Sequence, residues 1–295
     1  MKPHYSKPAD IAFWAFNTVF LGAVIALALI PILHVISVSL SDVKAVTGLR
    51  VSLYPIGFSF KSFMLVLEDF NFFRSLFNSV IYTVSSTAVA LLLTTSGAYA
   101  LSKKRIRLRS LMMKFIIVTM IVHAPLIPSF LLVNKLGMYN TIWAIIIPGS
   151  LHTYNLIIMR AFFNDIPDDL EDAAEIDGLS PIGVLVRIVL PTSTAILATI
   201  TLFYLVDFWN SWFRAFLYLS SRDKQPLTIY LRNILEMYMG GKENIISLIG
   251  GIQSKISHET MKAATIVLVS FPIAVTYPFL QKYFVRGVMI GAIKG

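Results

Sequence analysis

The chain has 295 residues, of which 56% are hydrophobic and only 14% are charged, and its mean hydropathy is +0.73. A soluble protein carries roughly 25% charged residues, so this composition excludes an ordinary water-soluble domain and indicates a membrane protein. The sequence contains no cysteine, which excludes disulfides, thiolate metal sites and cysteine nucleophiles. The net charge of +9 matters through its distribution, because basic residues set the orientation of membrane helices.

Six apolar runs are long enough to cross a bilayer as helices, which takes about 20 residues. They are Ile11–Leu40, Phe72–Leu101, Leu111–Val133, Thr141–Phe163, Thr192–Leu219 and Ala263–Tyr283. No period-two alternation favours a barrel, and backbone groups in lipid have to bond internally. We therefore expect an all-α polytopic membrane protein with six transmembrane helices. The first run is too long for a signal peptide, so we expect it to be the first membrane helix.

The runs divide the chain into two predicted parts. Residues 1–71 would hold the first membrane helix and an external segment, and residues 72–295 would form the core domain. Within that core we expect a cytoplasmic loop at residues 164–191 and a cytoplasmic tail at residues 284–295.

Basic residues between the second and third runs predict the orientation. The densest cluster in the chain comprises Lys103, Lys104, Arg105, Arg107 and Arg109. By the positive-inside rule this loop is cytoplasmic, and with six spans both termini are then cytoplasmic as well. We interpret the cluster as a topology signal rather than a binding site. The external segment 220–262 is long for a connection, and it would be either a landing surface for another protein or a self-packed subdomain.

The polar loop between the fourth and fifth runs is the most informative segment. Asn164 or Asp165 would cap a first short helix, whose opening turns are crowded with carboxylates near the positive end of the helix dipole. Gly178 suits a left-handed residue that ends this helix. Ser180 and Pro181 then supply a cap and a first-turn proline for a second helix. The sequence therefore predicts a helix–turn–helix at the membrane surface.

Residues of this loop follow a known spacing: a carboxylate with two alanines, three residues, glycine, nine residues, and Ile-x-Leu-Pro. The matching positions are Asp172, Ala173, Ala174, Gly178, Ile188, Leu190 and Pro191. The pattern resembles the EAA loop of ATP-binding-cassette (ABC) importer permeases, with Asp172 in place of the expected glutamate. The resemblance implies that the loop docks on a separate ATPase, which the two small alanines would let approach the backbone. An ordinary interfacial linker is the alternative.

The resemblance extends over roughly residues 70–295 and is strongest to the carbohydrate permeases of the maltose type. It is carried by Arg160–Pro167, by Trp209 and Asn210, by Gln225–Thr228 and by the tail Gln281–Gly295, which resembles that of the second maltose permease subunit. It implies a type I importer permease (MetI-like) fold. The most similar subgroup handles oligosaccharides of complex polysaccharides, including acidic ones such as alginate.

The resemblance also implies site residues. Those that couple to the ATPase would be Glu171, Asp172, Ala173, Ala174, Glu175, Asp177 and Gly178. Because Asp172 is shorter than glutamate, Glu171 or Glu175 would make the salt bridge to the ATPase instead. The tail residues that reach between two ATPase subunits would be Gly291, Lys294 and Gly295.

Polar residues inside the apolar runs are candidates for a translocation pathway. Asp207 lies deep in the fifth run beside Trp209 and Asn210, and an ionisable group within a span is a functional candidate. Alternatively, Asp207 lies near the external interface, with Trp209 in an aromatic belt. Tyr154 and Asn155 are further pathway candidates, for which ordinary helix packing is the alternative.

The sequence lacks a phosphate-binding Gly-rich loop, a nucleophile elbow and paired metal-ligand spacing, so we expect no catalysis and no cofactor in this chain. ATP and magnesium would be bound by the partner ATPase. We expect a permease subunit of an ATP-driven oligosaccharide importer in the bacterial inner membrane. Its partners would be a second homologous permease, an ATPase dimer, an external solute-binding protein and lipid, but not nucleic acid. The alternatives are an ion-gradient-driven secondary transporter, an importer permease for a non-sugar solute and, least supported, a membrane enzyme.

Overall fold

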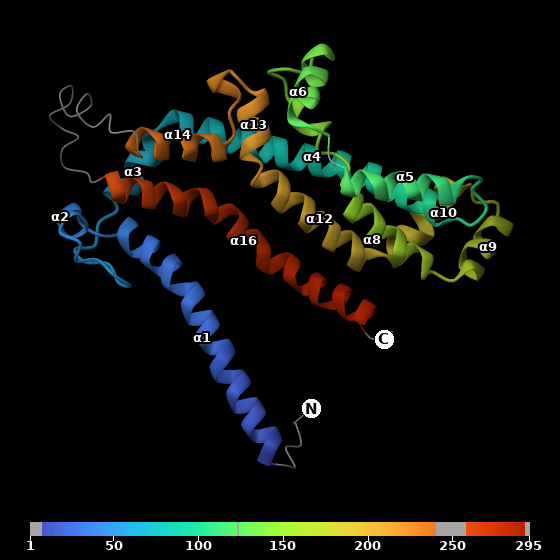
Figure 1. Ribbon diagram of the computed structural model, residues 1–295, viewed down its shortest axis with the longest axis horizontal. Coiled ribbons are helices and arrows are strands. Elements are labelled where there is room, and N and C mark those ends of the chain that lie inside the picture. Colours follow the sequence, from blue (N-terminus) through green and yellow to red (C-terminus); the bar gives the residue numbers. More distant parts are fainter. Residues whose placement is uncertain (1–7, 123, 240–257, 293–295) are drawn as a thin grey trace. The chain divides into compact units, whose positions relative to one another are not determined.

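The computed structural model describes residues 8–122, 124–239 and 258–292, and within these ranges the chain forms helices joined by turns, without a strand (Figure 1). The chain divides into two compact units. One comprises Met1–Phe70 with Leu231–Ser270, and the other comprises Asn71–Tyr230 with Phe271–Gly295.

The first unit begins with the long apolar helix α1 (Pro8–Ser39). None of the residues in its most apolar stretch is buried, as expected of a helix that meets lipid rather than protein. The short helices α2 (Val43–Thr47) and α3 (Lys61–Glu68) follow. Val38 at the end of α1 packs with Ala45, Val46, Val51 and Ala263 in a small buried cluster.

The second unit contains most of the remaining helices. In chain order the elements are α4 (Phe70–Ser102), α5 (Arg109–Ile121), α6 (Leu126–Lys135), α7 (Trp143–Ile146), α8 (Thr153–Asn164), α9 (Asp168–Ile176), α10 (Pro181–Val184), a π turn (Leu185–Val189), α11 (Leu190–Thr192), α12 (Thr194–Trp209), α13 (Trp212–Tyr218) and a 3-10 turn (Arg222–Lys224). Two further helices, α14 (Leu227–Met239) and α16 (His258–Ala292), belong partly to each unit.

Among the residues that the structure describes, three helices are long and apolar enough to cross a membrane alone, namely α1, α4 and α16. Two further candidates are bent pairs: α5 with α6, bent by 113°, and the helix Pro181–Thr192 with α12, bent by 88°. The helical fold is as predicted, and the described helices supply three to five spans. The total of six spans, with both termini inside, stays a prediction.

Three of the predicted runs are not continuous helices, and each break has a local cause. The third run breaks where Pro125 precedes α6, and the fourth breaks between α7 and α8, where Pro148 and Gly149 lie. The fifth ends its first helix at Trp209, since Asn210 turns its side-chain amide back to the carbonyl of Val206 at 2.9 Å.

The core of the second unit lies where α4, α8 and α12 meet. It contains Ala90, Ala98, Tyr99, Met159, Phe163, Ala174, Val184, Val189, Ile196, Ile200, Tyr204 and Phe208. Small residues let α4 and α8 approach closely: a β-carbon on Gly97 would lie 3.3 Å from Cδ1 of Leu156. Ala174, Val184 and Val189 come from the polar loop and its following helix, so one continuous buried cluster joins this loop to α12.

Candidate functional site

Helix α9 is the first half of the predicted helix–turn–helix. Its first turns carry Asp168, Asp169 and Glu171, whose negative charge the helix dipole stabilises. The predicted cap at Asn164 or Asp165 is wrong. Helix α8 continues through Asn164, and α9 begins at Asp168 with Pro167 as its N-cap residue. The proline disfavours helical geometry for Ile166 before it, so α9 does not begin earlier.

The turn after α9 forms as predicted. Gly178 has φ +82°, and its N–H donates to the carbonyl of Glu175 at 3.0 Å. The N–H of Leu179 donates to the carbonyl of Ala174 at 3.0 Å, which completes a Schellman motif. Ser180 then caps α10 by accepting from the N–H of Gly183 at 3.2 Å, with Pro181 in the first helical position.

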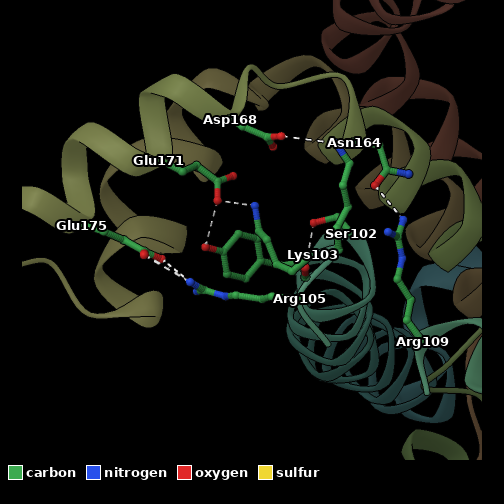
Figure 2. Close-up of polar contacts among 10 residues, drawn as sticks. Ser102, Lys103, Arg105, Arg109, Asn164, Asp168, Glu171 and Glu175 are labelled. Carbon is green, nitrogen blue, oxygen red and sulfur yellow. Dashed lines mark hydrogen bonds and ion pairs between the residues drawn. The ribbon is translucent and has the colours of Figure 1, made fainter. Parts of the chain in front are cut away.

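A partly buried ion pair holds the inner side of α9. Glu171 pairs with Lys103 from the basic loop between α4 and α5, and the hydroxyl of Tyr99 donates to the same carboxylate oxygen at 3.5 Å (Figure 2). The Lys103 ammonium also lies 4.5 Å from the centroid of the Tyr99 ring. The two charged side chains are only 16% and 11% exposed, so their attraction is little screened by water.

Three more contacts, closer to solvent, join the basic loop to the acidic loop and to the end of α8. Arg105 lies 2.8 Å from Glu175, and Lys104 lies 3.3 Å from Asp168. Arg109 donates to the side-chain oxygen of Asn164 at 3.3 Å (Figure 2). The basic cluster is therefore more than a topology signal, since four of its members bind the acidic loop and its approach from α8. The contacts also bring both loops to the same end of the unit, as the predicted orientation requires.

The predicted coupling residues divide between two faces of the loop. Glu171 and Ala174 are buried against the chain's own core and basic loop, and Glu175 is paired with Arg105. The exposed positions are Asp172, Ala173, Glu175, Asp177 and Gly178, together with Ile176, which is 87% exposed. Glu171 and Glu175 are thus paired with Lys103 and Arg105 within the chain, and their predicted salt bridge to an ATPase stays a prediction.

The predicted pathway residues are only partly brought together. A cavity of about 800 Å³ is lined by Asp207 and Asn210, with Leu202, Phe203, Val206, Ser211, Trp212, Phe213 and Arg214. Trp209 is half-buried and is not among the described lining residues. On α8, Tyr154 is exposed and Asn155 is buried. Arg214 was not among the predicted pathway residues, although a cation seven residues after Asp207 in an apolar run is an unusual signal.

The predicted tail residues are mostly beyond what the structure describes. Gly291 lies in the last turns of α16, whereas Lys294 and Gly295 lie outside the described residues. Their predicted position between ATPase subunits stays a prediction.

Residues 93–290 match the family described as "Binding-protein-dependent transport system inner membrane component". The chain is 36% identical, over 95% of its length and 98% of the relative's, to the "Polygalacturonan/rhamnogalacturonan transport system permease protein YtcP" of Bacillus subtilis (strain 168). It is 26% identical, over 98% and 99% of the two lengths, to the "Arabinooligosaccharides transport system permease protein AraQ" of Halalkalibacterium halodurans.

A similar chain occurs in a solved structure, "Crystal structure of a bacterial ABC transporter involved in the import of the acidic polysaccharide alginate". The match has a TM-score of 0.88 at 35% identity and covers 96% of this chain and 100% of the other. The loop spacing, the helical fold and these similarities agree: the chain belongs to the family of inner membrane components of binding-protein-dependent transport systems.

Proposed function

We propose that this permease subunit conducts an acidic oligosaccharide, and that the exposed face of α9 is the surface on which a separate ATPase docks. The observation that supports the substrate is the near full-length similarity to two proteins whose names concern polygalacturonan and alginate. Both polymers are chains of uronic acids, so their shared chemistry is a sugar ring that bears a carboxylate.

The chain is a multi-pass inner-membrane subunit of an ABC importer and not an enzyme, and a separate ATPase subunit hydrolyses ATP. Importers of this kind generally include a partner permease and a solute-binding protein. We propose that the partner permease is a different, homologous chain, that the ATPase is a dimer that binds ATP and magnesium, and that the binding protein delivers the oligosaccharide from outside.

The two faces of α9 support its proposed coupling role. The inner face is fixed by Glu171 on Lys103 and by Ala174 in the core, so α9 cannot shift without pulling on α4 and α12. The outer face offers Asp172 and Asp177 for ion pairs and Ile176 for apolar contact. A helix that is anchored on one side and exposed on the other can receive a push from another protein and pass it to its own bundle.

Substitution of Gly178 by tryptophan tests the docking surface. Gly178 has φ +82°, and a β-carbon at this position would meet nothing within 4 Å, so the new ring would project outward. Gly137 provides a matched control because it has φ +69° and equally open surroundings in a different loop. The left-handed conformation costs an L-residue roughly 1–2 kcal/mol, and this cost is the same at both sites.

The assay is uptake of labelled trigalacturonate into vesicles that contain the full importer, together with recovery of the ATPase on the purified permease. We expect Gly178→Trp to lose uptake and ATPase retention, while Gly137→Trp keeps both at equal membrane levels. Normal uptake by Gly178→Trp would contradict the docking role. Absence of uptake of uronic-acid oligomers by the wild-type importer would contradict the proposed substrate.

A further inference from the structure

The cavity beside Asp207 contains an ion pair whose two members differ in their exposure to solvent. Asp207 Oδ2 accepts from Arg214 Nη2 at 2.7 Å, and His152 Nε2 lies 3.7 Å from the same oxygen. The aspartate side chain is 41% exposed, whereas that of the arginine is 22% exposed. The carboxylate is therefore the more accessible charge, and the guanidinium lies behind it.

The chain's own atoms surround the guanidinium of Arg214. Its Nε donates to Ser211 Oγ at 2.6 Å, and its central carbon lies 5.0 Å from the centroid of the Phe208 ring. The third nitrogen lies over Gly149, where a β-carbon would overlap Nη1 and approach Cζ to 2.9 Å. Nε and Nη2 are thus hydrogen-bonded to Ser211 and Asp207, and Nη1 lies against Gly149, so these contacts hold the guanidinium in place beside Asp207.

Hydrogen-bond acceptors, by contrast, remain available in the cavity. Within the described part of the chain, neither Asp207 Oδ1 nor Asn210 Oδ1 accepts a hydrogen bond. Both residues line the cavity, and so do the large rings of Trp212 and Phe213, which are 44% and 45% exposed. A carboxylate acceptor next to an exposed aromatic face suits a sugar ring, which presents hydroxyl donors at its edge and an apolar C–H face.

We infer that this cavity is a subsite for one sugar ring, in which Asp207 accepts hydrogen bonds from ring hydroxyls and Trp212 contacts the apolar face of the ring. Arg214 is a positioning residue: it orients Asp207 and cancels its charge, so that an anionic solute is not repelled. The subsite recognises hydroxyls and not the carboxylate of the solute. This inference rests on the proposed oligosaccharide function.

Equilibrium binding to the purified full importer in lipid nanodiscs tests the subsite. The probes are labelled trigalacturonate and its carboxyl-reduced, neutral counterpart, which have the same ring number and linkage. We expect Asp207→Asn to weaken binding of the neutral probe about tenfold, because it loses a hydrogen bond to a charged acceptor, and to weaken binding of trigalacturonate by a smaller factor, because the uncompensated Arg214 attracts its carboxylates. The control variant Asp223→Asn, an exposed aspartate outside the cavity, should leave both affinities unchanged.

Variants of Arg214 separate its positioning role from a purely structural one. Arg214→Gln leaves Asp207 uncompensated, so it should weaken binding of the anionic probe more than that of the neutral probe. Arg214→Lys restores the positive charge and should recover most of this difference. Equal loss of both probes in Arg214→Gln, without recovery in Arg214→Lys, would overturn the positioning role.

Asp207→Asn decides the proposal even if an Arg214 variant does not assemble. Unchanged affinity for both probes would overturn the subsite. Tighter binding of trigalacturonate alone would overturn it too, because that result would make Arg214, once released, the receptor for the solute's carboxylate. A wild-type importer that binds neither trisaccharide would instead overturn the proposed function, and the subsite with it.

Discussion

Neutralising Glu171 should loosen α9 far more than neutralising its neighbour Asp168. Glu171→Gln leaves the Lys103 ammonium, only 16% exposed, without its counter-ion. Removing one partner of a fully buried pair costs about 3–5 kcal/mol, and the residual exposure here reduces this to about 2–3 kcal/mol. The Lys104–Asp168 pair is 83% and 74% exposed, so Asp168→Asn should cost about 0–1 kcal/mol.

Hydrogen exchange of the α9 amides, followed by mass spectrometry on the purified permease, measures this difference. A loss of 2–3 kcal/mol of local stability corresponds to exchange that is about 30- to 150-fold faster, whereas Asp168→Asn should change it by less than about fivefold. The double variant Lys103→Met with Glu171→Gln carries no uncompensated charge and should recover at least half of the loss. Similar exchange in Glu171→Gln and Asp168→Asn would refute the idea that the Lys103–Glu171 pair anchors α9.

Two further substitutions test close packing. Gly149→Ala should displace the guanidinium of Arg214 and weaken trigalacturonate binding as Arg214→Gln does. The control Gly22→Ala, where a β-carbon would meet nothing within 4 Å, should leave binding unchanged. Unchanged binding in Gly149→Ala would contradict the close contact between Gly149 and Arg214. Ala174→Leu should destabilise the permease by about 1–3 kcal/mol through overpacking of the core, and thermal unfolding measures this loss. Ala173→Leu, on the exposed side, should change stability by no more than about 0.5 kcal/mol; equal destabilisation would contradict the assigned faces.

Local signals in the sequence were sufficient for the turn and the second cap of the helix–turn–helix, but not for its first cap. Gly178 and the Ser180–Pro181 pair act within a few residues of their own positions, so their turn and cap follow from the chemistry of each residue. The contact between Lys103 and Glu171 spans 68 residues and depends on how α4 and α8 pack. The one feature of the sequence that indicated this contact was the opposite charge of two loops on the same predicted side of the membrane.

Runs of high hydropathy were a poor guide to helix continuity. The fourth run is apolar enough overall to be predicted as one helix, yet Pro148 and Gly149 interrupt it, because hydropathy reports the solvent that side chains prefer and not the backbone geometry that they allow. The sequence also did not indicate that this interruption makes room for a side chain of the proposed subsite. Gly149 accommodates the side chain of Arg214, which comes from another helix, and no local pattern shows that contact.

The buried cluster that begins beneath α9 with Ala174 extends to Phe208, whose ring lies under the guanidinium of Arg214. Protein interiors are packed as densely as organic crystals and compress very little, so this cluster has almost no free volume in which to absorb a displacement. A displacement of α9 would therefore be transmitted through the packed cluster to Phe208. If a nucleotide-driven partner docks on α9 as proposed, a displacement of α9 would reach Arg214 in the cavity through this cluster, without any contact between that partner and the solute.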